Sequence, residues 1–116
     1  MSGSLSLNIV TGTDWAVQIS WNDATGKPIL FSEPRMDIRQ EYDPNGSVIA
    51  RLDDTGNLDG LITIPQAGTL LLEMSAQTTT GLITGHGFWD LFVTVNGARV
   101  RLVFGTVDIS PHVTVS

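Results

Sequence analysis

The sequence contains no cysteine and only one lysine, Lys27. Without thiols the chain cannot form a disulfide scaffold, a cysteine-ligated zinc ribbon or a thiol enzyme. The absence of cysteine does not indicate whether the protein resides in an oxidising or a reducing compartment. Lys and Arg total 6 against 12 Asp and Glu, which gives a formal net charge of −6 at pH 7. Because phosphate binding depends on clustered Lys and Arg, this balance argues against a nucleic-acid partner.

Long apolar runs are also missing. No stretch approaches the roughly 20 residues of a membrane-spanning helix, so we expect no membrane insertion. Residues 1–4 do not begin a basic region followed by an apolar stretch, so no secretion signal is expected. With 116 residues, 41% of them hydrophobic, the chain is predicted to form a single domain over residues 1–116. A chain of this length buries about two-thirds of its unfolded surface, enough for one core.

Stretches long enough for helices are scarce, because 12 Gly and 5 Pro interrupt the chain. The longest stretch without either is 13–25. Within it, the apolar residues Trp15, Val17, Ile19 and Trp21 alternate with mainly polar neighbours. This period of two predicts a half-buried strand and places all four side chains in the core.

Shorter alternating segments separated by turns continue the pattern. Strands are expected within 5–10, 36–39, 47–52, 61–64 and 69–74, with turns at 23–28 and 43–46 and a polar loop at 53–60. Segment 75–85 fits either a single helical turn or an irregular crossing. About eight short strands in one chain predict an all-β fold. We expect an antiparallel β-sandwich of immunoglobulin-like or jelly-roll-like type, with a small barrel as the alternative.

The clearest local signal is Asn96-Gly97, the preferred pair for a two-residue type I′ hairpin turn. Taken literally, this turn fixes the register of the two flanking strands. It then pairs Val95 with Ala98, Val93 with Val100, Leu91 with Leu102, and Trp89 with Phe104. All eight residues are apolar and share one face, which we expect to be core. A bent or bulged extension past Gly105 is also expected.

The other face of this predicted hairpin is the candidate interaction surface. It carries Phe88, Phe92, Asp90, Arg99 and Arg101. Asp90 and Arg101 are expected to form a structural ion pair. An exposed aromatic pair beside charges is the kind of patch that packs against a partner.

One segment has the appearance of a catalytic motif. Asp54-Thr55-Gly56 matches the signature of aspartic proteases, whose small dimeric forms use two such aspartates to activate water. Its flanks do not fit, because Asp53 stands where apolar residues are usual and Asn57 where a small residue is usual. We interpret the segment as a turn and expect no enzyme activity and no catalytic residue. A dimeric aspartic protease is the less favoured alternative.

No cofactor or metal site is expected either. Asp53, Thr55, Asn57 and Asp59 occupy every second position, a spacing that can wrap calcium. The glycine of a calcium loop and its final glutamate are absent, so a plain acidic loop is favoured. His86 and His112 each lack a nearby second ligand in the sequence. The chain also has no serine-hydrolase elbow and no phosphate loop.

Four patches resemble small β-sandwich structural proteins of tailed bacteriophages and prophages, including the N-terminal domain of phage baseplate upper proteins. The first patch is Gly12-Thr13-Asp14, which opens the strand that runs to Trp21, and the second is the turn 23–28 followed by Met36–Arg39. The third is Gly68–Ser75. The fourth combines Trp89-Asp90-Leu91, the Asn96-Gly97 turn, residues 101–107 and Val113-Thr114. Members of that family more often carry Tyr at the position of Trp89 and the order Gly-Asp-Thr near Gly12.

The resemblance implies a non-enzymatic virion structural protein of the tail, baseplate or neck. Such a protein is made in the host cytoplasm and anchors fibre or receptor-binding parts by contacts with other virion proteins. Symmetric particles imply a homo-oligomer such as a trimer or hexamer. Arg35, Arg39 and Arg51 are then possible donors of interface salt bridges.

Two alternatives stay open. One is a carbohydrate- or host-binding module, in which Trp15, Trp21 or Trp89 would stack on sugars, and the other is a capsid decoration protein. Because each tryptophan shares a face with aliphatic residues, core packing is the favoured interpretation for all three.

Overall fold

The computed structural model describes residues 3–40 and 48–111. Within these ranges the elements are β1 Gly3–Ser4, β2 Leu7–Val10, β3 Trp15–Ser20, β4 Ser32–Gln40, β5 Val48–Asp53, β6 Gly60–Gln66, β7 Thr69–Met74, α1 Ala76–Thr80, β8 Gly85–Val95 and β9 Ala98–Ser110. The predicted turn at 43–46, His112 and the patch Val113-Thr114 lie outside the described residues.

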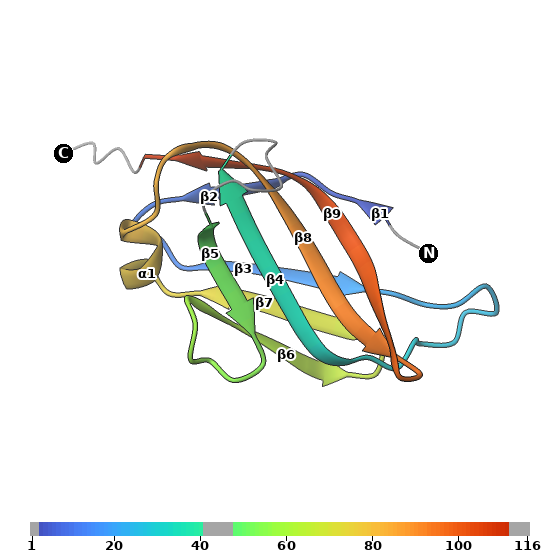
Figure 1. Ribbon diagram of the computed structural model, residues 1–116. Helices are drawn as coiled ribbons and strands as arrows, with labels where there is room; N and C mark the ends of the chain where they lie inside the picture. Colours follow the sequence, from blue (N-terminus) through green and yellow to red (C-terminus); the bar gives the residue numbers. More distant parts are fainter. Residues whose placement is uncertain (1–2, 41–47, 112–116) are drawn as a thin grey trace.

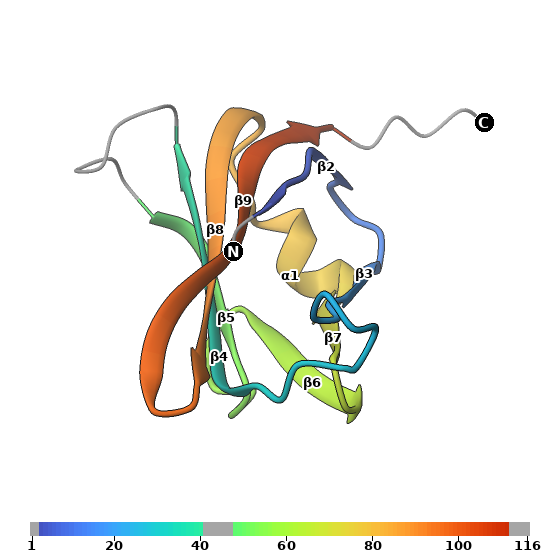
Figure 2. The same ribbon diagram turned by 90° about the vertical axis from the view of Figure 1, so that its right-hand side faces the viewer.

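The strands form two facing layers (Figures 1 and 2). One layer contains β9, β8, β4 and β5 in that order, with β1 and β2 both parallel to β9; the other contains β6, β7 and β3. A short parallel contact between β5 and β6 joins the layers. The predicted antiparallel β-sandwich is confirmed. The grouping of β3, β7 and β6 opposite β9, β8, β4 and β5 is that of an immunoglobulin-like sandwich.

The core lies between the layers and takes alternate residues from each strand. Its fully or nearly buried members are Leu7, Ile9, Trp15, Ile19, Met36, Ile38, Ala50, Leu52, Ile62, Leu70, Leu72, Met74, Trp89, Leu91, Val93, Leu102, Val103, Val107 and Ile109. Val17 and Trp21 pack against this core but stay partly exposed. Burial of each large aliphatic or aromatic side chain contributes roughly 1.5–3 kcal/mol to the stability of the fold. Because the apolar residues alternate along each strand, every strand buries one face, and two such layers pack with these faces together.

The β8–β9 hairpin begins in the predicted register and then leaves it. Asn96 and Gly97 have φ of 51° and 80°, as a type I′ turn requires, and Val93 pairs with Val100. The register then shifts between Leu91 and Phe92. Leu91 therefore pairs with Val103 instead of Leu102, and Trp89 pairs with Gly105 instead of Phe104.

This bulge corrects one predicted core position, Phe104. Because β9 carries one extra residue, both Leu102 and Val103 are buried and the alternation of faces inverts beyond them. Phe104 consequently lies on the outer face, half-buried, and is not a core residue as predicted. Val100, on the other side of the bulge, is also only half-buried.

Gly105 is required by the chain that crosses it. A Cβ at this position would lie 2.0 Å from the backbone oxygen of Leu5. That same oxygen accepts a hydrogen bond of 2.9 Å from Nε1 of Trp89, and the Leu5 N–H donates to the Phe104 oxygen. The glycine thus lets the segment between β1 and β2 pass close to β9 and satisfy the buried indole.

Of the two structures expected for segment 75–85, a helical turn or an irregular crossing, the chain forms the helical turn α1. Ser75 is the N-cap of α1, and its Oγ accepts a hydrogen bond from the Thr78 N–H. Thr79 is fully buried; its hydroxyl accepts from the Gly12 N–H and donates to the Thr13 oxygen. These bonds fix α1 against the turn between β2 and β3. Among the described residues, no helix has the length and apolar character needed to cross a membrane.

Candidate interaction face

The outer face of the β9-β8-β4-β5 layer collects most of the candidate interface residues. Strand pairing sets side by side on this face Arg35, Asp37 and Arg39 from β4, Arg51 from β5, Phe88, Asp90 and Phe92 from β8, and Arg101 and Phe104 from β9. We call this set the arginine face. Its inward neighbours on β8, Trp89 and Leu91, are core residues, which fixes the outward direction of the set.

Asp37 is the centre of the arginine face. Its Oδ1 lies 3.6 Å from Arg35 Nε and 3.5 Å from Arg51 Nε, and its Oδ2 accepts a hydrogen bond of 3.3 Å from Arg39 Nη2. Within the described part of the chain, Asp37 Oδ1 and Arg51 Nε are buried atoms without a hydrogen-bond partner. One carboxylate therefore positions three guanidinium groups through charge more than through directed bonds.

Asp90 faces Asp37 directly across the β4–β8 pairing. Burial, and then the negative charge of Asp37, raise the pKa of Asp90 above its ordinary value, while Arg39 and Arg101 act in the opposite direction. Like charges in opposite cross-strand positions destabilise a sheet. The surrounding arginines are what allow these two carboxylates to share the face.

The predicted ion pair between Asp90 and Arg101 is wrong. In the described part of the chain no ion pair joins them; the Arg101 guanidinium lies over the Phe104 ring instead, 4.4 Å from its centroid. Arg101 pairs with Phe92 as the predicted register requires, but the bulge beyond it sets Phe104 opposite Asp90 and moves Asp90 one residue further from Arg101 along β9. Phe104 and Asp37 are the face residues that sequence reasoning missed. For Phe104 the signal was Gly105, because glycine inside a strand often marks a bulge.

Arg99 stands apart from the other predicted interface residues. It lies at the turn end of the hairpin, where its Nη1 donates to the Glu33 backbone oxygen and to Thr94 Oγ1. It therefore ties the hairpin to the start of β4. All five arginines of a chain of net charge −6 lie on or beside one face.

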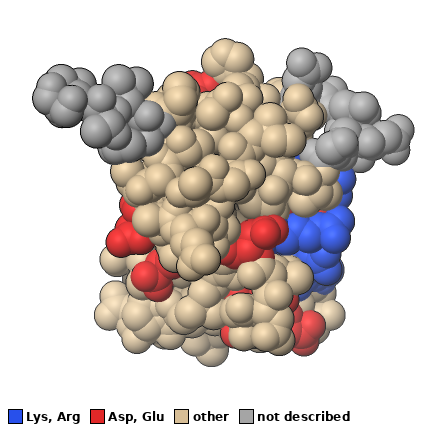
Figure 3. All heavy atoms as spheres, turned by 90° about the vertical axis from the view of Figure 1, so that its left-hand side faces the viewer, with Lys and Arg blue, Asp and Glu red and all other residues tan. Residues whose placement is uncertain are grey.

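The space-filling view shows the same separation of charge (Figure 3). The visible basic side chains gather at the right edge, on the side of the β9-β8-β4-β5 layer, whereas acidic side chains are spread over the visible face. Phe88 and Phe92 are half-buried within the arginine face. The face thus combines aromatic surface with positive charge.

The acidic loop between β5 and β6 uses its oxygens locally. Asp53 Oδ1 accepts hydrogen bonds from Thr55 N (3.0 Å) and Thr55 Oγ1 (2.6 Å), and Thr55 Oγ1 accepts from Asn57 N. The bond from the Thr55 hydroxyl is the main reason that the pKa of Asp53 is lowered. Asp59 Oδ2 accepts from Arg51 N, and Asp54 is exposed. This geometry is that of a turn.

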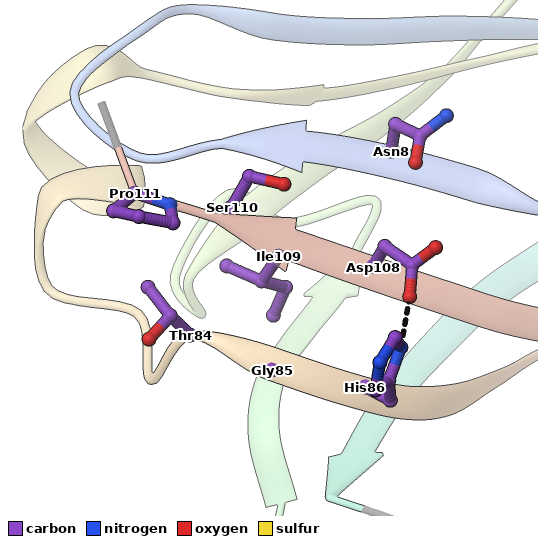
Figure 4. A pocket seen from close by; sticks show the side chains of 8 residues that line it. All are labelled: Asn8, Thr84, Gly85, His86, Asp108, Ile109, Ser110 and Pro111. Atoms are coloured by element: carbon purple, nitrogen blue, oxygen red, sulfur yellow. Dashed lines mark hydrogen bonds and ion pairs between the residues drawn. The ribbon is translucent and has the colours of Figure 1, made fainter. Parts of the chain in front are cut away.

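A second group of polar residues lies where β8 begins and β9 ends (Figure 4). The Nδ1 atom of His86 contacts the Asp108 carboxylate beside an open hollow of about 490 Å³, which Asn8, Thr84 and Ser110 also line. The His86 side chain is 88% exposed. Among the described residues, no group of three or more acidic or histidine side chains could hold a metal ion.

The tryptophans are mostly inaccessible. Trp15 and Trp89 are 7% and 2% exposed, so their rings have no free face for stacking on a sugar. Trp21 is partly exposed but packs against the core.

No family model and no curated protein sequence matches this chain. Solved structures resemble it in fold. CopC from Methylosinus trichosporium OB3b has a TM-score of 0.50 and 12% identity, covering 95% of this chain and 90% of its own. Murine CRIg has a TM-score of 0.49 and 12% identity, covering 93% and 92%. At this identity the likeness to CopC supports the β-sandwich and nothing further.

Proposed function

We propose that this chain is a non-enzymatic structural protein of a tailed-phage particle, a tail or baseplate component that joins fibre or receptor-binding parts to their neighbours. The sequence resemblance supports the phage setting. The observation that carries the proposal is the arginine face, where three phenylalanines and four arginines cover one side of a rigid sandwich.

The composition of this face suits protein contact. Aromatic residues and arginine are enriched in the buried centres of protein interfaces, whereas lysine is depleted. Phe88, Phe92 and Phe104 offer apolar area that a partner would remove from water, at about 25 cal/mol per Å². A matching partner presents carboxylates to the arginines and an apolar centre to the rings.

The ion-pair network also prepares the face for binding. Asp37 holds three arginine side chains near fixed positions, so less side-chain entropy is lost when a partner binds. The guanidinium of Arg101 is similarly held over Phe104. Such preorganisation favours a permanent contact in an assembly.

The direct test is mass spectrometry of purified phage particles from a strain that encodes the chain, with copy number measured against the major tail and capsid proteins. We expect a fixed number per particle, in multiples of three or six. Hundreds of copies would contradict the baseplate position and indicate a capsid decoration or tail-tube protein. Complete absence from mature particles would overturn the structural proposal.

The arginine face itself is tested by a paired substitution. Phe92→Ala with Arg101→Ala should sharply reduce incorporation into particles, while circular dichroism shows an intact fold. Leu61→Ala is the matched control, because Leu61 is half-buried on the outer face of the other layer. Equal incorporation of both variants would show that the arginine face is not the contact surface.

A further inference from the structure

β3 is an edge strand that lacks the usual protection against pairing. Among the described strands it pairs only with β7, and over the six residues Trp15–Ser20 that register contains no bulge. The strand has no charged residue and no proline. Natural proteins usually block free edges with charges, prolines, bulges or very short strands.

The other ends of the sheet carry such protection. β1, at the far end of the strand order, has two residues, Gly3 and Ser4. β5, which meets β6 over only two residue pairs, carries Arg51 and Asp53. β2, which among the described strands pairs only with β9, also lacks charge and proline, but it has four residues against the six of β3. β3 is therefore the longer of the two unprotected edges.

The backbone of β3 is arranged to accept another strand. The Trp21 N–H donates to the Gly68 oxygen (2.7 Å), which extends the β3–β7 ladder by one hydrogen-bonded pair. Hydrogen-bonded pairs alternate along an antiparallel ladder, so Ala16, Gln18 and Ser20 direct their N–H and C=O groups away from β7. The Ser20 and Thr69 hydroxyls are 3.2 Å apart, as expected for the closer, non-hydrogen-bonded pairs.

The surface next to this edge is almost free of charge. On the outer face of the β6-β7-β3 layer, the pairing sets Ala16 and Gln18 beside Glu73 and Leu71, with Leu61 and Thr63 beyond them. Glu73 is the one charged residue of that set. A second copy of a chain of net charge −6 therefore meets little charge repulsion here. Val17 points inward yet stays partly exposed at the edge, so an added strand would cover it.

We propose that two copies of this chain pair through β3, antiparallel, about a two-fold axis at Gln18. Opposite residues in an antiparallel pair lie on the same face, so the axis passes through a residue and not between two. Gln18 is the middle one of the three residues with outward backbone groups. Ala16 then faces Ser20 of the second copy, and Val17 faces Ile19. The two three-stranded layers become one continuous six-stranded sheet.

This inference does not rest on the proposed function, because it concerns only contacts between identical copies. Sedimentation analysis of the purified chain tests it, at concentrations up to about 100 μM, which reveals dimers with Kd up to about that value. The wild type should be a dimer. Gln18→Lys should be a folded monomer, because it sets two ammonium groups together at the axis. A monomeric wild type would overturn the proposal, whatever the particle measurement shows.

The matched control is Thr63→Lys, which adds the same charge on the same outer face but two strands from the edge. It should leave the dimer intact. If Thr63→Lys and Gln18→Lys dissociate the dimer equally, the contact lies on the sheet face and not at the β3 edge. If neither variant changes the sedimenting mass of the dimer, the two copies contact each other neither at the β3 edge nor on the outer face of the β6-β7-β3 layer.

The register is tested by cross-linking, since the chain contains no cysteine. A Gln18→Cys chain should form a covalent dimer on mild oxidation, because hydrogen-bonded partners have Cα atoms about 5.5 Å apart, within disulfide range. Thr63→Cys should stay monomeric under denaturing conditions. Cross-linking of both variants at the same rate would contradict a two-fold axis at Gln18.

Discussion

Asp90 shows how the neighbours of a single residue decide its effect on stability. Its pKa is raised in the folded chain, so folding is opposed while the carboxylate is charged. This penalty is complete at neutral pH, shrinks as the pH falls through the raised pKa, and is gone below the ordinary value of 3.8. Asp90→Asn should therefore stabilise the fold by roughly 0.2–1 kcal/mol at pH 7, with no gain near pH 3.5. Urea unfolding at both pH values measures this.

Asp37→Asn is the control with the opposite sign. The same substitution on the facing strand removes three ion pairs and leaves Arg51 Nε without a counter-charge. We expect a loss of about 1 kcal/mol at pH 7. Equal destabilisation by Asp37→Asn and Asp90→Asn would show that Asp90 is a favourable ion-pair partner and contradict the raised pKa.

Thr79 is a buried polar residue whose importance lies in the backbone groups it satisfies. Thr79→Val keeps the shape but leaves the Gly12 N–H and the Thr13 oxygen without their partner. The expected loss of unfolding free energy is about 2 kcal/mol, measured by thermal or urea unfolding. Thr80→Val is the control: Thr80 is exposed and bonds only within α1, so its loss should stay below about 0.5 kcal/mol. Similar losses would show that the Thr79 bonds are not what fixes α1.

At the level of elements, the β8–β9 hairpin depends on two glycines for different reasons. Gly105→Ala places a Cβ 2.0 Å from the Leu5 backbone oxygen, an atom that cannot move without breaking the Trp89 hydrogen bond. We expect a loss of about 2–4 kcal/mol and red-shifted tryptophan emission, as Trp89 becomes hydrated. Gly97→Ala meets open space, so only its φ of 80° is strained and the loss should be about 1 kcal/mol. Equal losses would contradict a steric role for Gly105.

The same hairpin shows what alternation in a sequence can and cannot predict. The Asn96-Gly97 turn and the pairing up to Phe92 follow from local backbone chemistry, and they are confirmed. The burial of Trp15, Ile19 and Trp89 follows from the two-residue period. The bulge does not, because Leu102 and Val103 are both apolar and either could face the core. Just past the bulge, Gly105 is approached by Leu5, one hundred residues away in the sequence, a long-range contact that alternation cannot predict.

For the arginine face, too, the sequence predicts which side chains point outward but not which residues lie opposite one another. Outward placement of Phe88, Asp90 and Phe92 follows from the alternation on β8, which has no inversion of its own. The partners of Asp90 depend on which residues of β4 and β9 arrive opposite it, and these are long-range consequences of strand order. Asp37, the centre of the arginine face, was therefore not recognisable, although Arg35 and Arg39 flank it in the sequence.

For the whole molecule, the two proposed contact surfaces lie on opposite layers of the sandwich. The arginine face covers the β9-β8-β4-β5 layer, and the β3 edge belongs to the β6-β7-β3 layer. Substitutions on one surface share no contacts with the other, so their effects should be independent. A subunit with two separate contacts can pair with its own copy at one and bind a different protein at the other.

Arg101→Glu tests whether the two contact surfaces act independently. The change reverses a charge on the arginine face, so the purified variant should sediment as the same dimer as the wild type while losing its place in the particle. Gln18→Lys should show the converse in solution, a monomer with the arginine face intact. If Arg101→Glu dissociates the purified dimer instead, the two copies associate face to face through the large layer. The β3 edge would then be unpaired in the dimer, and the separation of the two contacts would be refuted.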